Sequence, residues 1–278
     1  MSLTNKIDFA VVFTVRNANP NGDPLNGNRP RLDYEHHGEV SDVCLKRKIR
    51  NRLQDLGEPI FVQSDDRSND GHHSLKERAE KCDALANALK AKDGNDENII
   101  AAACKSWFDV RAFGQVFAYK NLGNKKDVSI GIRGPVSIHS AVSIDPVRLS
   151  EIQITKSVNN EPGEKKGSDT MGLKHRVDYG VYVTYGSINT QLATKTGFSD
   201  ADAERIREAL VSLFTNDTSS ARPDGSMEVK KVIWWHHNCP TGQYSSAKVH
   251  RSIKITIDGD VSISEPLVGL EHKIYEGV

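Results

Sequence analysis

The sequence predicts a mixed α+β fold of the ferredoxin-like, RRM-type class, in which the long elements follow the order β, α, β, β, α, β. Three observations carry this prediction. Apolar residues alternate along Ile7–Val15, as in a strand with at least one buried face. A helix with a Ser-Asp capping signal follows at Ser41, and a second capped helix begins at Ser199. We therefore expect one domain, residues 1–278, with insertions.

The first strand leads into a polar loop, Arg16–Asp33, that cannot form a helix or a central strand. Its residues Asn17–Pro30 include five Asn, three Pro and two Gly, and these residue types favour turns. The pairs Asn21-Gly22 and Asn26-Gly27 both favour positive φ.

The helix after this loop combines an apolar stripe with a basic flank. Leu45, Ile49, Leu53 and Leu56 recur at helical spacing. The basic residues beside them, on an arc of roughly 100°, are Lys46, Arg47 and Arg50. A strand, an ordered polar loop and a cationic helix together predict an anion-binding site, although taken singly each is also typical of a solvated surface.

Residues 60–105 are expected to form an inserted, mostly helical lobe. One helix is predicted from Ser74 to near Gly94 and another over Asp96–Lys105. The lobe has too few apolar residues for an independent domain. After it, Trp107–Tyr119 has strand-like residues, with Gly114 at a bulge or a close approach.

A long hairpin is predicted in the second half of the chain. Ile152 and Ile154 lie on one strand and Val177–Tyr185 on the next, and Ser157–Gly172 between them has almost no core-forming residues. Loops of this length are usually functional or disordered. Further strands are expected over Val128–Ile144, Met227–Trp235 and Val249–Ile257.

Composition and charge exclude several classes of function. Lys plus Arg equals Asp plus Glu, at 37 each, so any attraction to nucleic acid must be local. The four Cys are widely separated, which is typical of a reducing compartment. The sequence has neither a signal-peptide pattern at its start nor an apolar run of 18 residues. We expect a cytoplasmic protein that does not associate with membranes.

Motifs for catalysis and cofactors are weak. Neither a phosphate-binding G-x-x-x-x-G-K-[ST] loop nor a G-x-S-x-G elbow occurs. His36-His37, His72-His73 and His236-His237 are doublets, and adjacent strand residues face opposite sides, so a doublet rarely gives one metal two ligands. We expect neither a metal nor a cofactor. Asp33 with His36 or His37 leaves a nuclease hypothesis open.

Several colinear motifs then resemble one known family over nearly the whole chain. They are N-A-N-P-N-G-D-P from Asn17, R-P-R-L-D from Arg29, S-D-V-C-L-K-R-K-I-R from Ser41, Phe108–Phe117, Gly131–Ile138, Ser143–Val147, Trp234–Asn238 and Ser245–His250. Together they resemble the CRISPR-associated backbone subunit of type I Cascade in its type I-C form.

This resemblance implies a hand-shaped protein with an RRM-like palm, helical fingers at 60–105 and a β-hairpin thumb at 155–174. Copies would polymerise along the spacer of a guide RNA (crRNA), with other Cascade subunits, and leave bases free to pair with target DNA. A guide holder that accepts any sequence should contact phosphates, which position but do not specify. The expected RNA contacts are Arg16, Asn17, Asn19, Asn21, Gly22, Arg29, Arg31, Lys46, Arg47, Arg50, Arg111, Gly114, Gln115, Arg133, Gly134, Lys165, Lys166, Met171, Lys174 and Arg176.

Within the thumb, Met171 and Leu173 precede Lys174 and Arg176. An apolar side chain beside cations can wedge between bases while the cations hold the phosphates. The alternative for this segment is a loop whose Met covers a strand end.

The main alternative is catalytic. Related backbone subunits of type III complexes cleave bound RNA with a loop Asp, for which Asp33 is the candidate here. The E-H-H-G-E segment after Asp33 does not resemble their loop, so the resemblance implies a protein without enzymatic activity. A generic RNA endonuclease using His36 or His37 is a third hypothesis.

Overall fold

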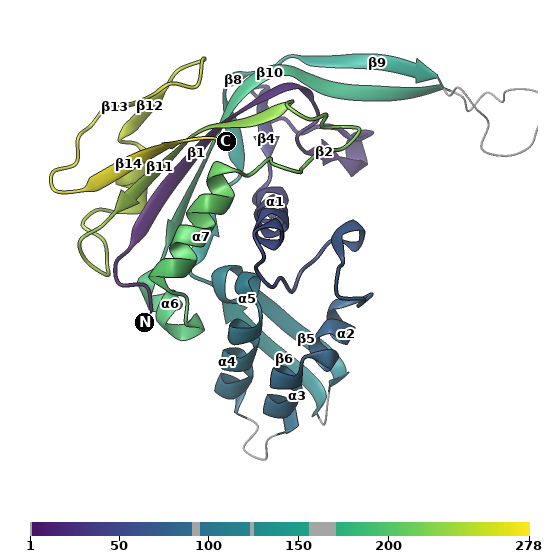
Figure 1. Ribbon diagram of the computed structural model, residues 1–278. Coiled ribbons are helices and arrows are strands. Elements are labelled where there is room, and N and C mark those ends of the chain that lie inside the picture. Colours follow the sequence, from purple (N-terminus) through teal and green to yellow (C-terminus); the bar gives the residue numbers. More distant parts are fainter. Residues whose placement is uncertain (1, 91–94, 123–124, 156–170) are drawn as a thin grey trace, which may run out of the picture.

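A large antiparallel sheet organises the computed structural model, which describes residues 2–90, 95–122, 125–155 and 171–278 (Figure 1). The fold is therefore of the α+β class. The sheet order is β14 (Glu271–Glu276), β11 (Met227–His236), β1 (Ile7–Ala18), β10 (Met171–Ile188), β8 (Ala141–Pro146) and β4 (His37–Val40). Two further strands, β7 (Val136–Ile138) and β9 (Leu149–Thr155), also pair with β10.

β1 lies inside the sheet because both of its faces are apolar. It pairs antiparallel with β10 on one side and β11 on the other, and Phe9 lies opposite both Gly186 and Trp234. All of Ile7–Phe13 is buried, which confirms the strand and the burial of its second face.

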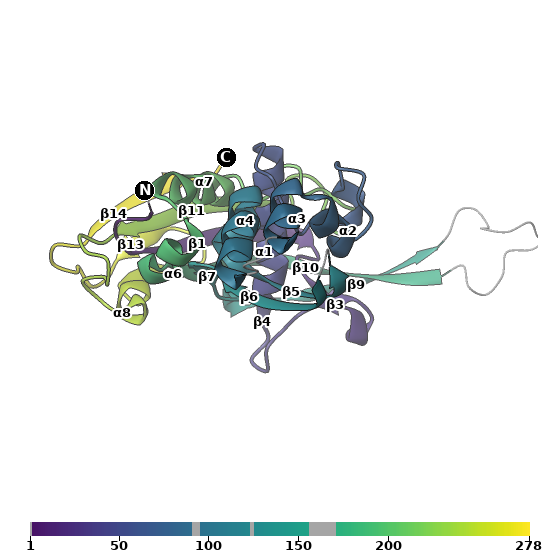
Figure 2. The same ribbon diagram turned by 90° about the horizontal axis from the view of Figure 1, so that it is seen from below.

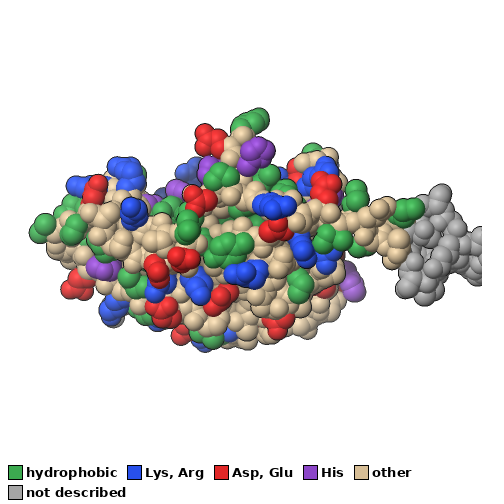
Figure 3. Space-filling model, turned by 90° about the horizontal axis from the view of Figure 1, so that it is seen from above, with side chains coloured by type: hydrophobic (Ala, Val, Ile, Leu, Met, Phe, Trp, Pro, Cys, Tyr) green, Lys and Arg blue, Asp and Glu red, His purple; other side chains and the backbone are tan. Residues whose placement is uncertain are grey.

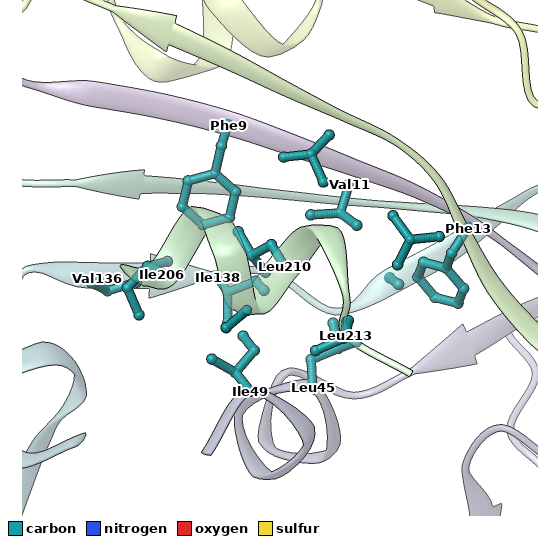
Figure 4. Packing of buried hydrophobic residues seen from close by; sticks show 14 of the residues in the cluster. Phe9, Val11, Phe13, Leu45, Ile49, Val136, Ile138, Ile206, Leu210 and Leu213 are labelled. Atoms are coloured by element: carbon teal, nitrogen blue, oxygen red, sulfur yellow. The ribbon is translucent and has the colours of Figure 1, made fainter. Parts of the chain in front are cut away.

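Helices cover one face of the sheet and form the main core with it. They are α1 (Asp42–Asp55), α6 (Thr190–Thr196) and α7 (Asp200–Val211). Figure 4 shows Phe9, Val11 and Phe13 of β1 facing the apolar residues of α1 and α7. Ser41 and Ser199 cap α1 and α7 through hydrogen bonds to backbone N–H groups, and the Ser199 cap is a capping box with Asp202. Both predicted caps are confirmed.

The C-terminal part of the chain covers the opposite face. There Ala10 and Val12 of β1 contact a third apolar cluster that includes Trp235 and Val249. The covering elements are α8 (Ser246–His250), β12 (Ile253–Ile255) and β13 (Val261–Ile263). A continuous strand over Val249–Ile257 was therefore the wrong prediction, because Ser245 caps a short helix through the N–H of Lys248.

A separate lobe has its own core, beneath the sheet in Figure 1. Phe61, Trp107 and Phe117 lie at its centre, with ring centroids 4.6–6.5 Å apart. Its elements are α2 (Leu75–Lys81), α3 (Asp83–Lys90), α4 (Asp96–Ser106), α5 (Phe108–Phe113) and the hairpin of β5 (Gly114–Leu122) with β6 (Lys125–Arg133).

This lobe corrects the sequence analysis in three ways. The helix predicted from Ser74 is two helices, because Cys82 is extended, with φ −79° and ψ 107°. Residues 108–113 are helical rather than strand-like. The lobe's core also takes in Ile130 and Ile132 of β6, so it extends past the expected 60–105 and is richer in apolar residues than the sequence suggested.

The β9–β10 hairpin projects away from the rest of the molecule (Figures 1 and 2). Its register runs from Val177↔Leu149 to Met171↔Thr155, so both strands of the predicted hairpin are present. The predicted tip, apart from Met171 and Gly172, lies outside the described residues. Among the described residues, none of the helices is long and apolar enough to span a membrane.

Candidate nucleic-acid interface

The Asn-rich loop is built from short elements held by its own side chains. They are β2 (Gly22–Asp23), a 3-10 turn (Pro24–Asn26) and β3 (Arg29–Pro30). Gly27 and Asn28 have φ of 59° and 57°, which confirms positive φ at the second Asn-Gly pair. The same prediction at Asn21-Gly22 was wrong. Gly22 is needed for a close approach instead, because a Cβ there would lie 2.0 Å from Asn28 Oδ1.

Asn21 joins this loop to the start of α1. Its Oδ1 accepts hydrogen bonds from the backbone N–H and the hydroxyl of Ser41, both at 2.9 Å. Asn19 is buried, and its Nδ2 donates to the carbonyl of Asn28 at 2.7 Å. These two Asn residues therefore shape the loop, while Arg16 and Asn17 are exposed beside it.

A buried ion-pair cluster fixes the segment behind the loop. Lys48 is 1% exposed and pairs with Asp217, which also accepts from Arg222 Nε at 3.1 Å. Burial lowers the pKa of Lys48 below its usual range, although Asp217 opposes this effect. The cluster anchors the segment whose Ala221 carbonyl accepts the N–H of Asn19 at 2.9 Å.

The loop also contacts the base of the hairpin. Arg29 Nε donates to Glu151 Oε1 at 2.9 Å, which joins β3 to β9. A cavity of about 260 Å³ lies between these parts of the chain. It is lined by Asn19, Gly27, Asn28, Ile154, Leu173, Lys174, His175, Ser220 and Ala221.

Several cations of the Asn-rich loop, α1 and β10 have weak partners or none among the described residues. Arg47 is exposed and has no ion pair within the described part of the chain, and Arg16 lies over the ring of Tyr179 at 4.7 Å. Lys46 pairs with Asp42 at 3.0 Å and Arg31 with Asp23 at 3.4 Å. Both pairs are partly exposed to solvent, which weakens them, so their cations could exchange a carboxylate for a phosphate. Lys174 and Arg176 lie on the adjoining stretch of β10.

The hairpin itself exposes apolar side chains. Met171 and Leu173 are each 61% exposed and Ile154 is 48% exposed. Figure 3 shows hydrophobic side chains along the projecting arm, and Lys and Arg interspersed with Asp and Glu over the body. An arm that exposes apolar residues along its outer part is typical of a binding element.

The structure does not bring the remaining predicted residues to this junction. Arg50 Nε donates to the buried carboxylate of Asp109 at 2.9 Å, and Arg111 donates to Asp202 at 2.8 and 3.2 Å. Both arginines therefore hold elements together inside the fold. Lys165 and Lys166 lie outside the described residues.

Two predicted glycines have packing roles at the base of the lobe. A Cβ on Gly114 would lie 2.2 Å from the carbonyl oxygen of Ile132, and one on Gly134 would lie 2.3 Å from that of Ala112. Their neighbours Gln115 and Arg133 are half-buried and exposed, respectively, on β5 and β6. This group is distinct from the loop and hairpin.

Asp33 has a structural role in a tight turn. Its Oδ1 accepts from the N–H groups of Glu35 at 2.9 Å and His37 at 2.8 Å. Desolvation alone would raise the pKa of Asp33, but these hydrogen bonds and the nearby His37 ring lower it below its usual range. The carboxylate is therefore ionised and committed to the turn. Among the described residues, no group of three or more His, Cys, Asp or Glu could hold a metal ion.

Sequence reasoning missed the segment 215–226, which supplies Ser220 and Ala221 to the cavity. This stretch lacks apolar periodicity, so its only signal was Asp217. That acid could not have been paired with Lys48, because the two residues are 169 positions apart.

Comparisons with known proteins agree on one family. The family model described as "CRISPR-associated protein Cas7" matches residues 5–267. A CRISPR-associated protein Cas7 from Haloferax volcanii is 28% identical over 234 residues, which is 79% of this chain and 67% of that protein.

Two solved structures align with most of this chain at low sequence identity. A chain of a "CRISPR RNA-guided surveillance complex, pre-nicking" has a TM-score of 0.49 and 14% identity, and the match covers 83% of this chain and 78% of the other. A chain of a "CRISPR RNA-guided surveillance complex" has a TM-score of 0.45 and 15% identity, covering 83% and 69%.

Proposed function

Since this chain belongs to the CRISPR-associated Cas7 family, we propose that it is a non-catalytic backbone subunit that binds crRNA. In this proposal, copies polymerise along the spacer of the guide in a type I-C Cascade, together with other Cascade subunits. The bound RNA presents its bases for pairing with target DNA.

The arrangement of the elements supports a palm, fingers and thumb. The strand order β11-β1-β10-β8, with α1 and α7 on one face, fits an RRM-type palm. The lobe with the second core corresponds to the fingers and the β9–β10 hairpin to the thumb.

The junction of the Asn-rich loop, α1 and the hairpin carries the proposal. It gathers cations from three parts of the chain around exposed apolar side chains, without a base-reading motif. Phosphate contacts position RNA and leave its sequence unread. We assign the RNA contacts here to Arg16, Asn17, Arg29, Arg31, Lys46, Arg47, Met171, Lys174 and Arg176.

The proposal is tested by RNA binding of the purified protein. The wild type should bind RNAs of unrelated sequence with similar affinity, and binding should weaken steeply with salt because each neutralised phosphate releases counterions. Arg47→Ala with Lys174→Ala should reduce the salt slope by about 2, roughly one per lost phosphate contact. The affinity for every RNA should fall alike.

Arg207→Ala is the matched control, because that arginine lies on α7 and pairs with Glu204 and Tyr275. It should leave RNA affinity unchanged. Binding that is selective for one sequence, or equally tight from low to high salt, would contradict the proposal. Cleavage of the bound RNA that is lost in Asp33→Asn would favour the endonuclease alternative.

A further inference from the structure

The turn at Asp33–His36 presents a side chain that the fold does not use. Tyr34 is fully exposed, at 105% of its reference area. The turn that carries it is rigid, because Asp33 accepts two backbone N–H groups, the N–H of His36 donates to the carbonyl of Asp33 at 3.2 Å, and Leu32 bridges Gly38. The carbonyl of His36 also accepts the N–H of Val147 at 2.9 Å. A preorganised, exposed Tyr is a typical anchor of a protein interface.

The charge around Tyr34 disfavours RNA as its partner. Asp33 and Glu35 flank it, and the Glu35 side chain is 84% exposed. In the described part of the chain, the only basic side chain within 4 Å of the Glu35 carboxylate is His37, at 3.9 Å. Two carboxylates beside the ring would repel a phosphate backbone, so a basic protein surface is the better match.

A cavity lined by basic residues lies elsewhere on the molecule. It has a volume of about 550 Å³ and lies between α4 and α6, at the contact of the lobe with the main body. Lys105 and Lys195 line it together with Arg111, which is already paired with Asp202, and its lining has no acidic residue. Its wall also includes Thr196, whose side-chain hydroxyl is buried without a hydrogen-bond partner in the described structure.

We propose that the Asp33–His36 turn of one copy docks into the α4–α6 cavity of the next copy. Tyr34 fills the cavity, and Glu35 pairs with the exposed Lys195 at its rim. The turn adjoins β4 in the upper half of Figure 1, whereas α4 and α6 lie in the lower half, so a chain cannot fill its own cavity. Two different patches make a head-to-tail contact, which leaves both ends free to add further copies.

This inference rests on the proposed assembly along RNA, and the test separates the two. Assembly is measured by mass photometry on a long RNA, and intrinsic affinity on an RNA too short to hold two copies. Tyr34→Ala should weaken assembly about tenfold or more, as loss of an interface anchor does, and leave the affinity for the short RNA unchanged. Val268→Ala, which truncates a side chain that is 87% exposed in a distant loop, should change neither.

Charge exchange tests the pairing directly. Glu35→Lys and Lys195→Glu should each weaken assembly, and the double variant should recover most of it. Lys254→Glu, an exposed change on β12, should not rescue Glu35→Lys. Equal assembly by all these variants, or a double variant no better than the singles, would overturn the proposal. A lower affinity of Tyr34→Ala for the short RNA would assign Tyr34 to the nucleic acid and also overturn it.

A disulfide trap works without RNA. Cys104, a free thiol, lines the same cavity, so the trap is built on Cys104→Ser. In that background Tyr34→Cys combined with Thr194→Cys should give a ladder of cross-linked oligomers at high protein concentration, and each single variant should not. A ladder formed by a protein that fails to bind the short RNA would support the contact and contradict the proposed RNA function. Good binding to the short RNA without a ladder would contradict the contact and support the proposed RNA function.

Discussion

At the residue scale, neighbouring cations on one helix have different roles. Arg47 is exposed, whereas Arg50 is turned towards Asp109, 59 positions away in the sequence. Helical periodicity placed both residues beside the apolar stripe of α1. It could not separate them, because the partner of Arg50 comes from another element.

A buried carboxylate with two imidazoles makes stability depend on pH. Asp8 accepts from His237 Nε2 at 2.8 Å and from Lys6 at 2.9 Å, and His250 lies 3.7 Å from its other oxygen. Desolvation would raise the pKa of Asp8, but its hydrogen bonds lower it below the usual range. Burial lowers the pKa of His250 below 6.5.

We predict that His250 makes the fold less stable as the pH falls below about 6.5, the ordinary His pKa. Its pKa is lower in the folded state, so the unfolded chain binds the extra proton first and acid favours unfolding. His250→Gln should therefore flatten the rise in unfolding free energy between pH 5 and 7, measured by urea denaturation at about these two values. His272→Gln, an exposed change on β14, should leave the slope as it is. An unchanged slope in His250→Gln would contradict this assignment.

At the element scale, locally encoded features were predictable and long-range ones were not. β1, α1 and α7 followed from alternation and caps within their own residues. α5 did not, because Phe108, Val110 and Ala112 alternate like a strand and become helical only against the two cores that they join. The break at Cys82 had no Gly or Pro to mark it.

Gly114 was expected to contact RNA, but its geometry indicates a role in packing. Its φ of 80° and the 2.2 Å approach to Ile132 both oppose a side chain. Gly114→Ala should lower the unfolding free energy by about 2 kcal/mol or more. Gly131→Ala is the matched control, because it lies on the same hairpin with nothing within 4 Å of its Cβ. Equal stability of the two variants, by denaturant titration, would contradict the packing role.

Substitutions on the hairpin should impair assembly on RNA and leave the stability of the fold almost unchanged. Met171→Ser with Leu173→Ser changes two side chains that are each 61% exposed, so the unfolding free energy should move by about 0.5 kcal/mol or less. Regular assembly on long RNA, seen by electron microscopy, should be lost. Val116→Ser, at a residue that is 63% exposed on β5, should preserve assembly. Normal filaments from the double variant would remove these side chains from the proposed site.

At the scale of the whole molecule, a buried carboxylate lies where the two apolar cores meet. Asp109 is 1% exposed and accepts from Phe61 N at 2.7 Å, Val62 N at 3.1 Å and Arg50 Nε at 2.9 Å. The sequence predicted both parts, but the hub joins residues from three separate stretches and could not be anticipated.

Asp109→Ala should loosen the lobe more than the sheet. The change leaves the Arg50 guanidinium and two N–H groups without their partner, and breaking a buried pair costs about 3–5 kcal/mol. Hydrogen exchange should speed up in the lobe helices α2–α5 before it does in β1 and β11 of the sheet. Asp42→Ala breaks only the exposed pair with Lys46 and should cost about 1 kcal/mol or less. Uniform exchange across both cores would mean that they unfold as one unit.

Because β10 is continuous, the hairpin is a direct extension of a strand of the main sheet, and its length is set by the number of residues in that strand. One 18-residue strand runs from the sheet interior to Met171, and beyond Val177, its last residue opposite β1, it has only β9 as a partner. At about 3.3 Å per residue, the described arm extends roughly 20 Å. Its length can change only in steps of two residues on each strand, because a single inserted residue would turn Met171 and Leu173 to the other face. The reach of the hairpin can therefore be lengthened or shortened only in steps of about 6.6 Å, the rise of two residues along a strand.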